Sequence, residues 1–307
     1  MKKNIFKIAI VVGVLYFLFM DIDLDKVIVS ILEISWVGLL FTIISLILGD
    51  IFFSLRWRML LFGRCSLLAS FESVMISSFF NFILPAKLGE VSKVLYLKKI
   101  YNIAISDTTA ITIIEKFFDL FWISVLALVA SLYIFDDSIM GMSALGFIGG
   151  IILVGFLVKS NKLITVLNKI PFKFLRIYSK KVIYISKRRL RSKIIFQTFV
   201  ITGIIWLFYF FSNYLFFNYA FSFALSISQV SMVVIVSIIA MSIPLTPGGI
   251  GIYQAGLVAI LTFYGVDKEL ALVSGILFHI LAILLSGLFT LVIFFIRGEK
   301  LYVWKKS

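Results

Sequence analysis

The sequence predicts an all-α polytopic membrane protein, an inverted-topology repeat with about six full transmembrane helices and two re-entrant helical hairpins. Three observations support this fold class. The 307 residues are 62% hydrophobic and only 14% charged, with a mean hydropathy of +1.14, a composition typical of membrane-embedded helices. Basic residues flank the apolar runs, as the positive-inside bias predicts. Two Pro/Gly-rich breaks, Ile83–Glu90 and Pro244–Gly251, interrupt apolar sequence.

The second break, within Ser242–Gly256, separates the apolar runs Gln229–Ile243 and Ile252–Val266. Its prolines lack a backbone donor and its glycines disfavour helix, so no helix can continue through it. Non-helical backbone at membrane depth must be packed in protein or line a wet cavity. Pro85, in the first break, precedes Pro244 by 159 residues, and paired breaks in two halves of a chain indicate a transport site.

The first half-repeat, residues 1–135, begins with two predicted spans, Ile5–Met20 and Trp36–Phe53. Phe71–Leu84 has only 14 residues, too few to cross about 30 Å of hydrocarbon at roughly 1.5 Å per residue. With Val91–Leu97 it is predicted to form a hairpin that enters from the cytoplasmic side, because both flanks are basic. Ser106–Phe135 then spans outward. Two short full spans remain the alternative to the hairpin.

The second half-repeat, residues 141–300, begins with Gly141–Val158 returning inward. The loop Lys159–Lys193 carries twelve Lys/Arg and no acid, so it is predicted to be cytoplasmic, with amphipathic helices on the anionic lipids of the inner leaflet. Ile194–Tyr219 and Ala271–Ile296 are predicted spans. Gln229–Val266 is predicted as a hairpin from outside, again with two short spans as the alternative.

The charge pattern predicts one integral membrane domain, residues 1–307, in the cytoplasmic (plasma) membrane. Lys2, Lys3 and Lys7 place the N-terminus in the cytoplasm, and Arg297 and Lys300 place the C-terminus there. The same pattern explains the net charge of +14 without nucleic acid as a partner. The oligomeric state is not set by the sequence, and a homo-oligomer remains an alternative.

Charged residues within or beside apolar runs are the first candidates for a substrate-binding or translocation site. A charge at the centre of a lone helix costs roughly 2.5–3.5 kcal/mol, so such groups are expected to pair or to face water. Glu115 and Asp119 are four residues apart and share a helix face, with Lys87 or Arg56 as the expected counter-charge. The alternative is a network that only locks the bundle. This set comprises Arg56, Lys87, Glu90, Glu115 and Asp119.

The second break supplies the other candidates. A glycine-rich turn that opens a helix exposes N–H groups suited to phosphate, although the turn could instead be only a tight break. His279 is the single histidine and lies in an apolar run, where a packed histidine is the alternative to a ligand. The residues proposed to bind substrate here are Pro247, Gly248, Gly249, Gly251, Gln254 and His279.

Several classes of function are disfavoured. With one cysteine, Cys65, and one histidine, a His/Cys metal site is not expected. No nucleophile–base pair, phosphate-binding ATP loop or metal motif is found, so neither an enzyme nor a cofactor is predicted. Three hypotheses remain: a lipid translocase, a non-catalytic membrane subunit that docks a cytoplasmic lipid-modifying enzyme through Lys159–Lys193, and an ion channel.

Four motifs carry a resemblance to a known family. They are RWRMLL at Arg56–Leu61, LPAKLGEVSKVLYL at Leu84–Leu97, EKFFDL at Glu115–Leu120 and PLTPGGIGIYQAG at Pro244–Gly256. Together they resemble the flippase-like membrane region of lysylphosphatidylglycerol synthases, a family that also contains stand-alone membrane proteins. The motifs cover both halves of the chain.

The resemblance implies movement of an amphiphilic lipid between leaflets: a phospholipid, an aminoacyl-phospholipid or a lipid-linked sugar. Bifunctional relatives carry a soluble aminoacyltransferase domain, which is not expected in this chain, so the implied activity is transport. An aminoacyl-phosphatidylglycerol synthase is the enzyme implied for the docking alternative. The family often has Glu at Gln254 and Arg near His279, so a cationic cargo is not required.

Overall fold

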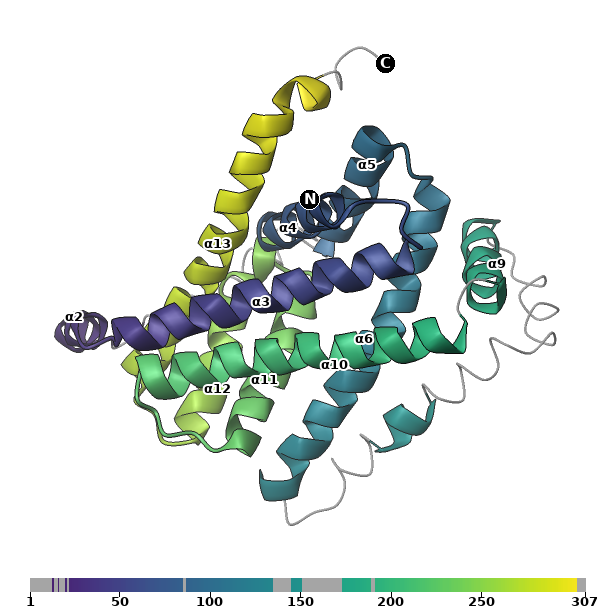
Figure 1. Ribbon diagram of the computed structural model, residues 1–307. Coiled ribbons are helices and arrows are strands. Elements are labelled where there is room, and N and C mark those ends of the chain that lie inside the picture. Colours follow the sequence, from purple (N-terminus) through teal and green to yellow (C-terminus); the bar gives the residue numbers. More distant parts are fainter. Residues whose placement is uncertain are drawn as a thin grey trace.

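A computed structural model describes residues 22–84, 87–134, 145–150, 173–188 and 191–302, with residues 13, 16 and 20. Within these ranges every regular element is a helix (Figure 1). The predicted spans Ile5–Met20 and most of Gly141–Val158 lie outside the described residues, as do Pro85 and much of the basic loop. The elements are α2 Leu24–Leu32, α3 Trp36–Leu60, α4 Leu67–Ile83, α5 Gly89–Tyr101, α6 Ile105–Ile134, α9 Lys173–Arg188, α10 Ser192–Leu215, a π-helix η2 Phe216–Ala220, α11 Ile227–Ser242, a 3-10 turn η3 Pro247–Gly249, α12 Ile252–Phe263 and α13 Lys268–Tyr302.

Three described helical segments are long and apolar enough to cross a membrane: Trp36–Leu60, Ser192–Ala220 and Lys268–Gly298. They confirm the predicted spans that begin near Trp36, Ile194 and Ala271. The helices α4, α5, α11 and α12 have 17, 13, 16 and 12 residues, fewer than the ~20 that a full crossing needs. Their re-entrant placement in a membrane stays a prediction.

Helices α3 and α10 run side by side in opposite directions and form one face of the molecule (Figure 1). Their approach is close because the contact positions on α3 carry no side chain. A Cβ at Gly38 would lie 2.5 Å from the backbone of Tyr219, and one at Gly49 would lie 2.8 Å from the Tyr209 ring. Ser45 Oγ donates to the Phe208 carbonyl at 2.8 Å, which fixes the register of the pair.

Each pair of short helices folds back on itself. In the first hairpin, Glu72 near the start of α4 accepts hydrogen bonds from Tyr96 and Tyr101 at the end of α5, both at 2.6 Å. In the second, Gly256 of α12 packs against Val236 of α11. Both predicted hairpins are therefore present as antiparallel helix pairs.

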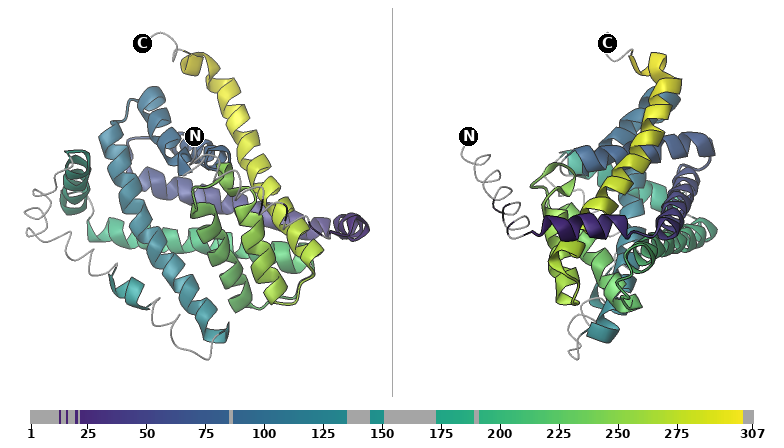
Figure 2. Two further views of the ribbon diagram at one scale, coloured as in Figure 1. Left: turned by 180° about the vertical axis from the view of Figure 1, so that it is seen from behind. Right: turned by 90° about the vertical axis from the view of Figure 1, so that its left-hand side faces the viewer.

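The packing of the two halves follows one scheme. Helix α4 packs on α3 and α13, whereas α11 packs on α10 and α6. The view from behind shows α6, α11, α12 and α13 on the face opposite α3 and α10 (Figure 2). Each half thus places its short hairpin against a long helix of the other half.

Two apolar clusters lie at opposite ends of this arrangement. The first joins Leu60, Leu97 and Ile293 at the ends of α3, α5 and α13. The second joins Phe216, Leu261 and other residues of η2, α11, α12 and the start of α13.

The ionisable residues are also segregated along α13. Arg297, near its end, binds Glu72 at 2.9 Å. Lys268, at its start, donates to the Met20 carbonyl at 2.7 Å, beside the acidic segment that carries Asp23 and Asp25. Arg297 and Lys268 thus mark opposite ends of α13, and their placement on the cytoplasmic and outer sides of a membrane stays a prediction.

Candidate functional site

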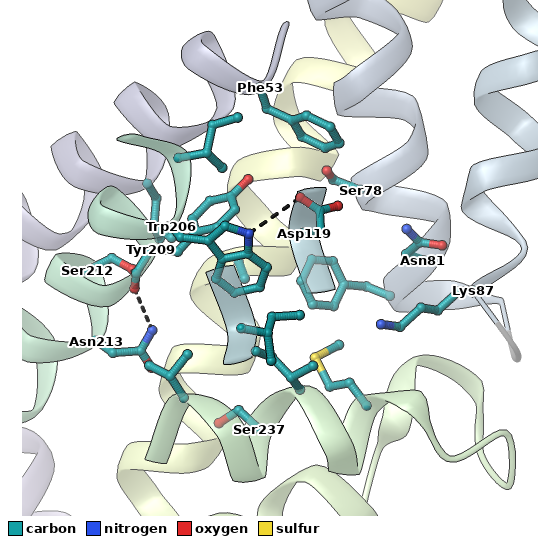
Figure 3. A pocket seen from close by; sticks show the side chains of 18 of the residues that line it. Phe53, Ser78, Asn81, Lys87, Asp119, Trp206, Tyr209, Ser212, Asn213 and Ser237 are labelled. Carbon is teal, nitrogen blue, oxygen red and sulfur yellow. Dashed lines mark hydrogen bonds between the residues drawn. The ribbon is translucent and has the colours of Figure 1, made fainter. Parts of the chain in front are cut away.

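A cavity of about 430 Å³ lies between the two apolar clusters. Figure 3 shows Lys87 and Asn81 on one side, Tyr209, Ser212 and Asn213 on the opposite side, and Asp119 between them. Both hairpins, α3, α6, α10 and α13 contribute lining residues, so the cavity lies where the two halves of the chain meet. Its walls are mostly apolar, with polar groups concentrated in a few places.

A buried ion-pair network forms one wall. Arg56 of α3 is only 1% exposed and binds Asp119 Oδ1 of α6 through Nη1 at 2.5 Å. Its second nitrogen, Nη2, lies 3.6 Å from Glu115 Oε2, and Nη1 also donates to Thr202 Oγ1 at 3.1 Å. The prediction that Arg56 is the counter-charge of Glu115 and Asp119 is confirmed.

Lys93 of α5 is the second cation of this network and is fully buried. Its Nζ lies 2.9 Å from Glu90 and 3.5 Å from Glu115. It also sits 4.0 Å from the centre of the Trp57 ring, where a cation is attracted by the ring face. The two carboxylates and the aromatic ring thereby offset the cost of burying this ammonium group in apolar surroundings.

Lys116 of α6 is the third cation, and its side chain is 45% exposed. It contacts Glu90, Glu115 and Asp119 at 3.0, 3.1 and 3.5 Å. Three cations thus face three carboxylates, so the network is close to neutral. A neutral, hydrogen-bonded cluster is the form in which ionised groups persist in an apolar environment.

Lys87 is the exception among the cations at the cavity. It follows the first break with a positive φ of 53°, is exposed, and lines the cavity. No ion pair joins it to another side chain within the described residues, so of the two alternative counter-charges expected for Glu115 and Asp119, the structure shows Arg56 and not Lys87. The reason is that Arg56 and Lys116 already occupy both carboxylates.

His279 of α13 marks the opposite wall. Its Nδ1 lies 3.1 Å from Gln254 Nε2, and its ring packs on Phe82 and Tyr253 at centroid distances of 5.4 and 4.9 Å. Gln254 also accepts from the Gly251 N–H at 2.7 Å. The side chain is 3% exposed, and its Nε2 is buried without a hydrogen-bond partner in the described structure.

The two breaks touch each other. Gly248 has φ +60°, and a Cβ there would lie 1.8 Å from the carbonyl oxygen of Phe82 at the end of α4. Three N–H groups of the predicted phosphate cradle are already bonded within the protein. The N–H groups of Gly249 and Ile250 donate to Thr246 and Pro247 carbonyls within the turn, and that of Gly251 donates to Gln254.

The sequence-predicted site residues therefore fall into three groups. Those that line the cavity are Arg56, Lys87, Glu90, Asp119 and His279. Glu115 and Gln254 stand one contact behind the lining, through Arg56 and His279. The break residues Pro247, Gly248, Gly249 and Gly251 form the turn against Phe82 and are not among the lining residues.

Neither Glu72 nor Asp50 was selected as a site residue from the sequence. Glu72 joins α4, α5 and α13 through Tyr96, Tyr101 and Arg297, and the same rule that selected Glu115, a carboxylate in an apolar run, would have found it. Asp50 accepts a hydrogen bond from Tyr209, a cavity residue, at 3.0 Å.

The comparisons with known proteins agree with this architecture. The family described as "Lysylphosphatidylglycerol synthase TM region" matches residues 4–289. No curated protein and no solved structure matches the chain. The apolar helices and the family together indicate a multi-pass membrane protein. Because the match covers nearly the whole sequence, the chain belongs to the lysylphosphatidylglycerol synthase transmembrane-region family.

Proposed function

We propose that the chain is a membrane lipid translocase, which reorients an amphiphilic phospholipid, aminoacyl-phospholipid or lipid-linked sugar between leaflets. The observation that carries this proposal is the cavity lined by both hairpins beside a buried ion-pair network. Its volume of about 430 Å³ falls within the range of roughly 300–1,000 Å³ found for ligand pockets. The headgroup would cross through this cavity while the acyl chains stay in lipid.

The lining of the cavity supports an inverted repeat. Asp50 and Tyr209, which bind each other across α3 and α10, are 159 residues apart. Six pairs of lining residues have the same separation, so corresponding positions of the two halves face one space, as in transporters built from inverted repeats. The pairs are Leu46 and Ile205, Phe53 and Ser212, Ser78 and Ser237, Phe82 and Met241, Asp119 and Phe278, and Ile123 and Ala282.

The charges favour a headgroup with a phosphate. Lys87 is the lining cation without an ion pair in the described structure, and Lys116 is partly exposed beside it. The lining carboxylates, Glu90 and Asp119, already have cations within 3.0 Å. A phosphate therefore finds a donor, whereas an ammonium group finds no carboxylate that is not already paired.

The test is lipid movement in proteoliposomes. Purified protein is reconstituted with a fluorescent phosphatidylglycerol, and membrane-impermeant dithionite reports the lipid that reaches the outer leaflet. Wild type is expected to move lipid, and Lys87→Gln is expected to reduce the rate tenfold or more, because the phosphate loses its cation. Lys26→Gln, the same change at an exposed residue of α2, is the matched control.

Two results would contradict the proposal. One is wild-type movement no faster than in empty liposomes. The other is a Lys87→Gln rate equal to that of Lys26→Gln. The ion-channel hypothesis is separated by planar-bilayer recording, in which we expect no conductance.

One observation favours the docking alternative. Helix α9, from the basic loop, packs on α6 and buries Val182 and Ile185, while Lys181 binds Asp107 at 2.6 Å. Lys180 and Tyr184 are exposed on this helix. Because α9 is fixed against α6, it presents a basic surface on which a cytoplasmic partner could dock. Under this alternative Lys180→Glu removes co-purification of a lipid-modifying enzyme and leaves lipid movement unchanged.

A further inference from the structure

Asp50, the acidic residue of α3, differs from the acidic side chains of α4, α5 and α6. Glu72, Glu90, Asp107, Glu115 and Asp119 all have a basic group within 4 Å. Asp50 has none within the described residues. It lies near the middle of α3, in the apolar sequence ISLILGDIFFSL, far from either end of the helix.

Asp50 is held by one neutral group. Tyr209 of α10 donates its hydroxyl to Asp50 Oδ1 at 3.0 Å. The two side chains are brought together because Gly49 leaves no room for a side chain between the helices: a Cβ there would lie 2.8 Å from Tyr209 Cε1. The pair is therefore built into the closest interface of the fold.

The charged groups nearby do not neutralise Asp50. The charges of Arg56 and Asp119 lie close enough to interact electrostatically with the Tyr209 hydroxyl. Arg56, however, is already bound by Asp119, Glu115 and Thr202. Of the other elements packed on α3, α4 and η2 carry no Lys or Arg. Lys193 lies at the far start of α10. Lys93 of α5, over the Phe53 and Trp57 rings, is engaged by Glu90 and Glu115. The carboxylate of α4, Glu72, belongs to the Arg297 cluster, and η2 presents the exposed Tyr219.

We propose that Asp50 is the binding site for a proton that crosses together with the lipid headgroup. This inference rests on the proposed function. A carboxylate without a cation in an apolar helix is destabilised, and proton uptake removes the charge. Acids within membrane-spanning segments form the proton sites of pumps and transporters.

Tyr209 connects this site to the cavity. When Asp50 is ionised, the Tyr209 hydroxyl is committed to it as a donor. When Asp50 takes up a proton, its own O–H donates to the Tyr209 oxygen. The Tyr209 hydroxyl then turns its hydrogen toward the cavity that this residue lines. A phosphate oxygen can then accept it. Proton and phosphate therefore favour each other's binding, and the coupling is reciprocal.

The test uses proteoliposomes with an imposed pH gradient and the fluorescent phosphatidylglycerol. For one proton per lipid, a gradient of one pH unit supports a leaflet ratio of up to about tenfold, with lipid accumulating on the more alkaline side. Asp50→Asn is expected to keep lipid exchange but lose the dependence on the gradient. Asp50→Glu is expected to restore it, and Tyr209→Phe to weaken it.

A second measurement does not depend on lipid movement. Infrared difference spectra between acidic and alkaline buffer should contain a protonated-carboxyl band that is lost in Asp50→Asn and shifted in Asp50→Glu. Glu33→Asn, at an exposed acid after α2, should leave both measurements unchanged. If wild type moves lipid without regard to the gradient, or Asp50→Asn keeps the response, the proton site is wrong and the translocase stands. If no lipid moves, the coupling and the translocase both fail.

Discussion

Arg56 and Lys93 are among the largest side chains in the fully buried part of the molecule. Neither residue adds much to the free energy of folding, because the attraction within a buried ion pair is about as large as the cost of its desolvation. What the network does is fix geometry. Each cation is held by carboxylates from α6, and Lys93 also by Glu90 of its own helix, so α3, α5 and α6 are aligned at the cavity wall.

Removing one charge from this network should be costly. In Glu115→Gln, Arg56 and Lys93 each lose a carboxylate in a site with no exposure to solvent. We predict a loss of roughly 3–5 kcal/mol in the free energy of unfolding, the range for an orphaned buried charge. Thermal unfolding in detergent measures it.

Glu33→Gln, an acid-to-amide change at an exposed position, is the control and should be close to neutral. The double variant Glu115→Gln with Lys93→Met should lose less than the sum of the single variants, because it removes both members of one contact. Additive losses would show that Glu115 and Lys93 are not coupled.

At this scale the sequence predicted the composition of the site better than its pairings. Arg56 was one of two alternative counter-charges expected for Glu115 and Asp119, the other being Lys87. Lys93 was not assigned to the network, because its contact with Trp57 depends on how α5 is rotated against α3, which spacing does not reveal. The pairing of Asp50 with Tyr209 could have been predicted, because the 159-residue offset between the two prolines, applied to Asp50, gives Tyr209.

At the scale of elements, two short hairpins carry the breaks, and their contact depends on one glycine. Gly248 combines a left-handed φ of +60° with a backbone neighbour, the Phe82 carbonyl, at the position of a Cβ. Only glycine satisfies both conditions. The turn thereby brings the end of α4 and the start of α12 together.

Gly248→Ala should separate the hairpins. A Cβ 1.8 Å from Phe82 O cannot be accommodated without moving backbone, so we predict a large fall in thermal stability and loss of lipid movement. Gly265→Ala is the matched control, because Gly265 also has a positive φ, +84°, but nothing within 4 Å of its Cβ position. It should show only the left-handed strain, roughly 1–2 kcal/mol. Equal effects would mean that the Phe82 contact is unimportant.

The elements themselves were largely predictable. Apolar run length and the Pro/Gly breaks located the starts of α3, α4, α10, α11, α12 and α13 to within about four residues, because serine caps set several of these starts locally. The ends of α3 and α13 lie beyond the predicted Phe53 and Ile296, at Leu60 and Tyr302. The closed hydrogen bonding of the Gly249–Gly251 turn was not predictable, since it depends on the Gln254 side chain returning to Gly251.

At the scale of the whole molecule, the basic loop Lys159–Lys193 and the acidic segment with Asp23 and Asp25 predict which side of a membrane each part of the chain faces. Single cysteines tested with membrane-impermeant thiol reagents can locate each part. Cys65 itself is buried and bonded to Ser70, and burial raises the pKa of its thiol, so little thiolate is present at neutral pH. Cys65→Ser provides the clean background.

On that background we predict that Leu88→Cys, beside the first break, is labelled only from the cytoplasmic side. Ile250→Cys, in the second break, should be labelled only from outside. Both residues are exposed. Lys180→Cys and Glu33→Cys serve as inside and outside controls. Labelling of the first break only from outside and of the second only from inside would rule out both hairpins and leave two pairs of ordinary short spans. Labelling of both from one side would leave one opposed hairpin and one pair of short spans.

The contact of Gly248 with the Phe82 carbonyl has a mechanical consequence. Two rigid backbones that already touch cannot both advance toward the centre, so an inward shift of one hairpin requires the other to retreat. A passage governed by such a pair is never open at both mouths together. The absence of a Cβ at Gly248 would thus distinguish a carrier from a pore that is open to both sides.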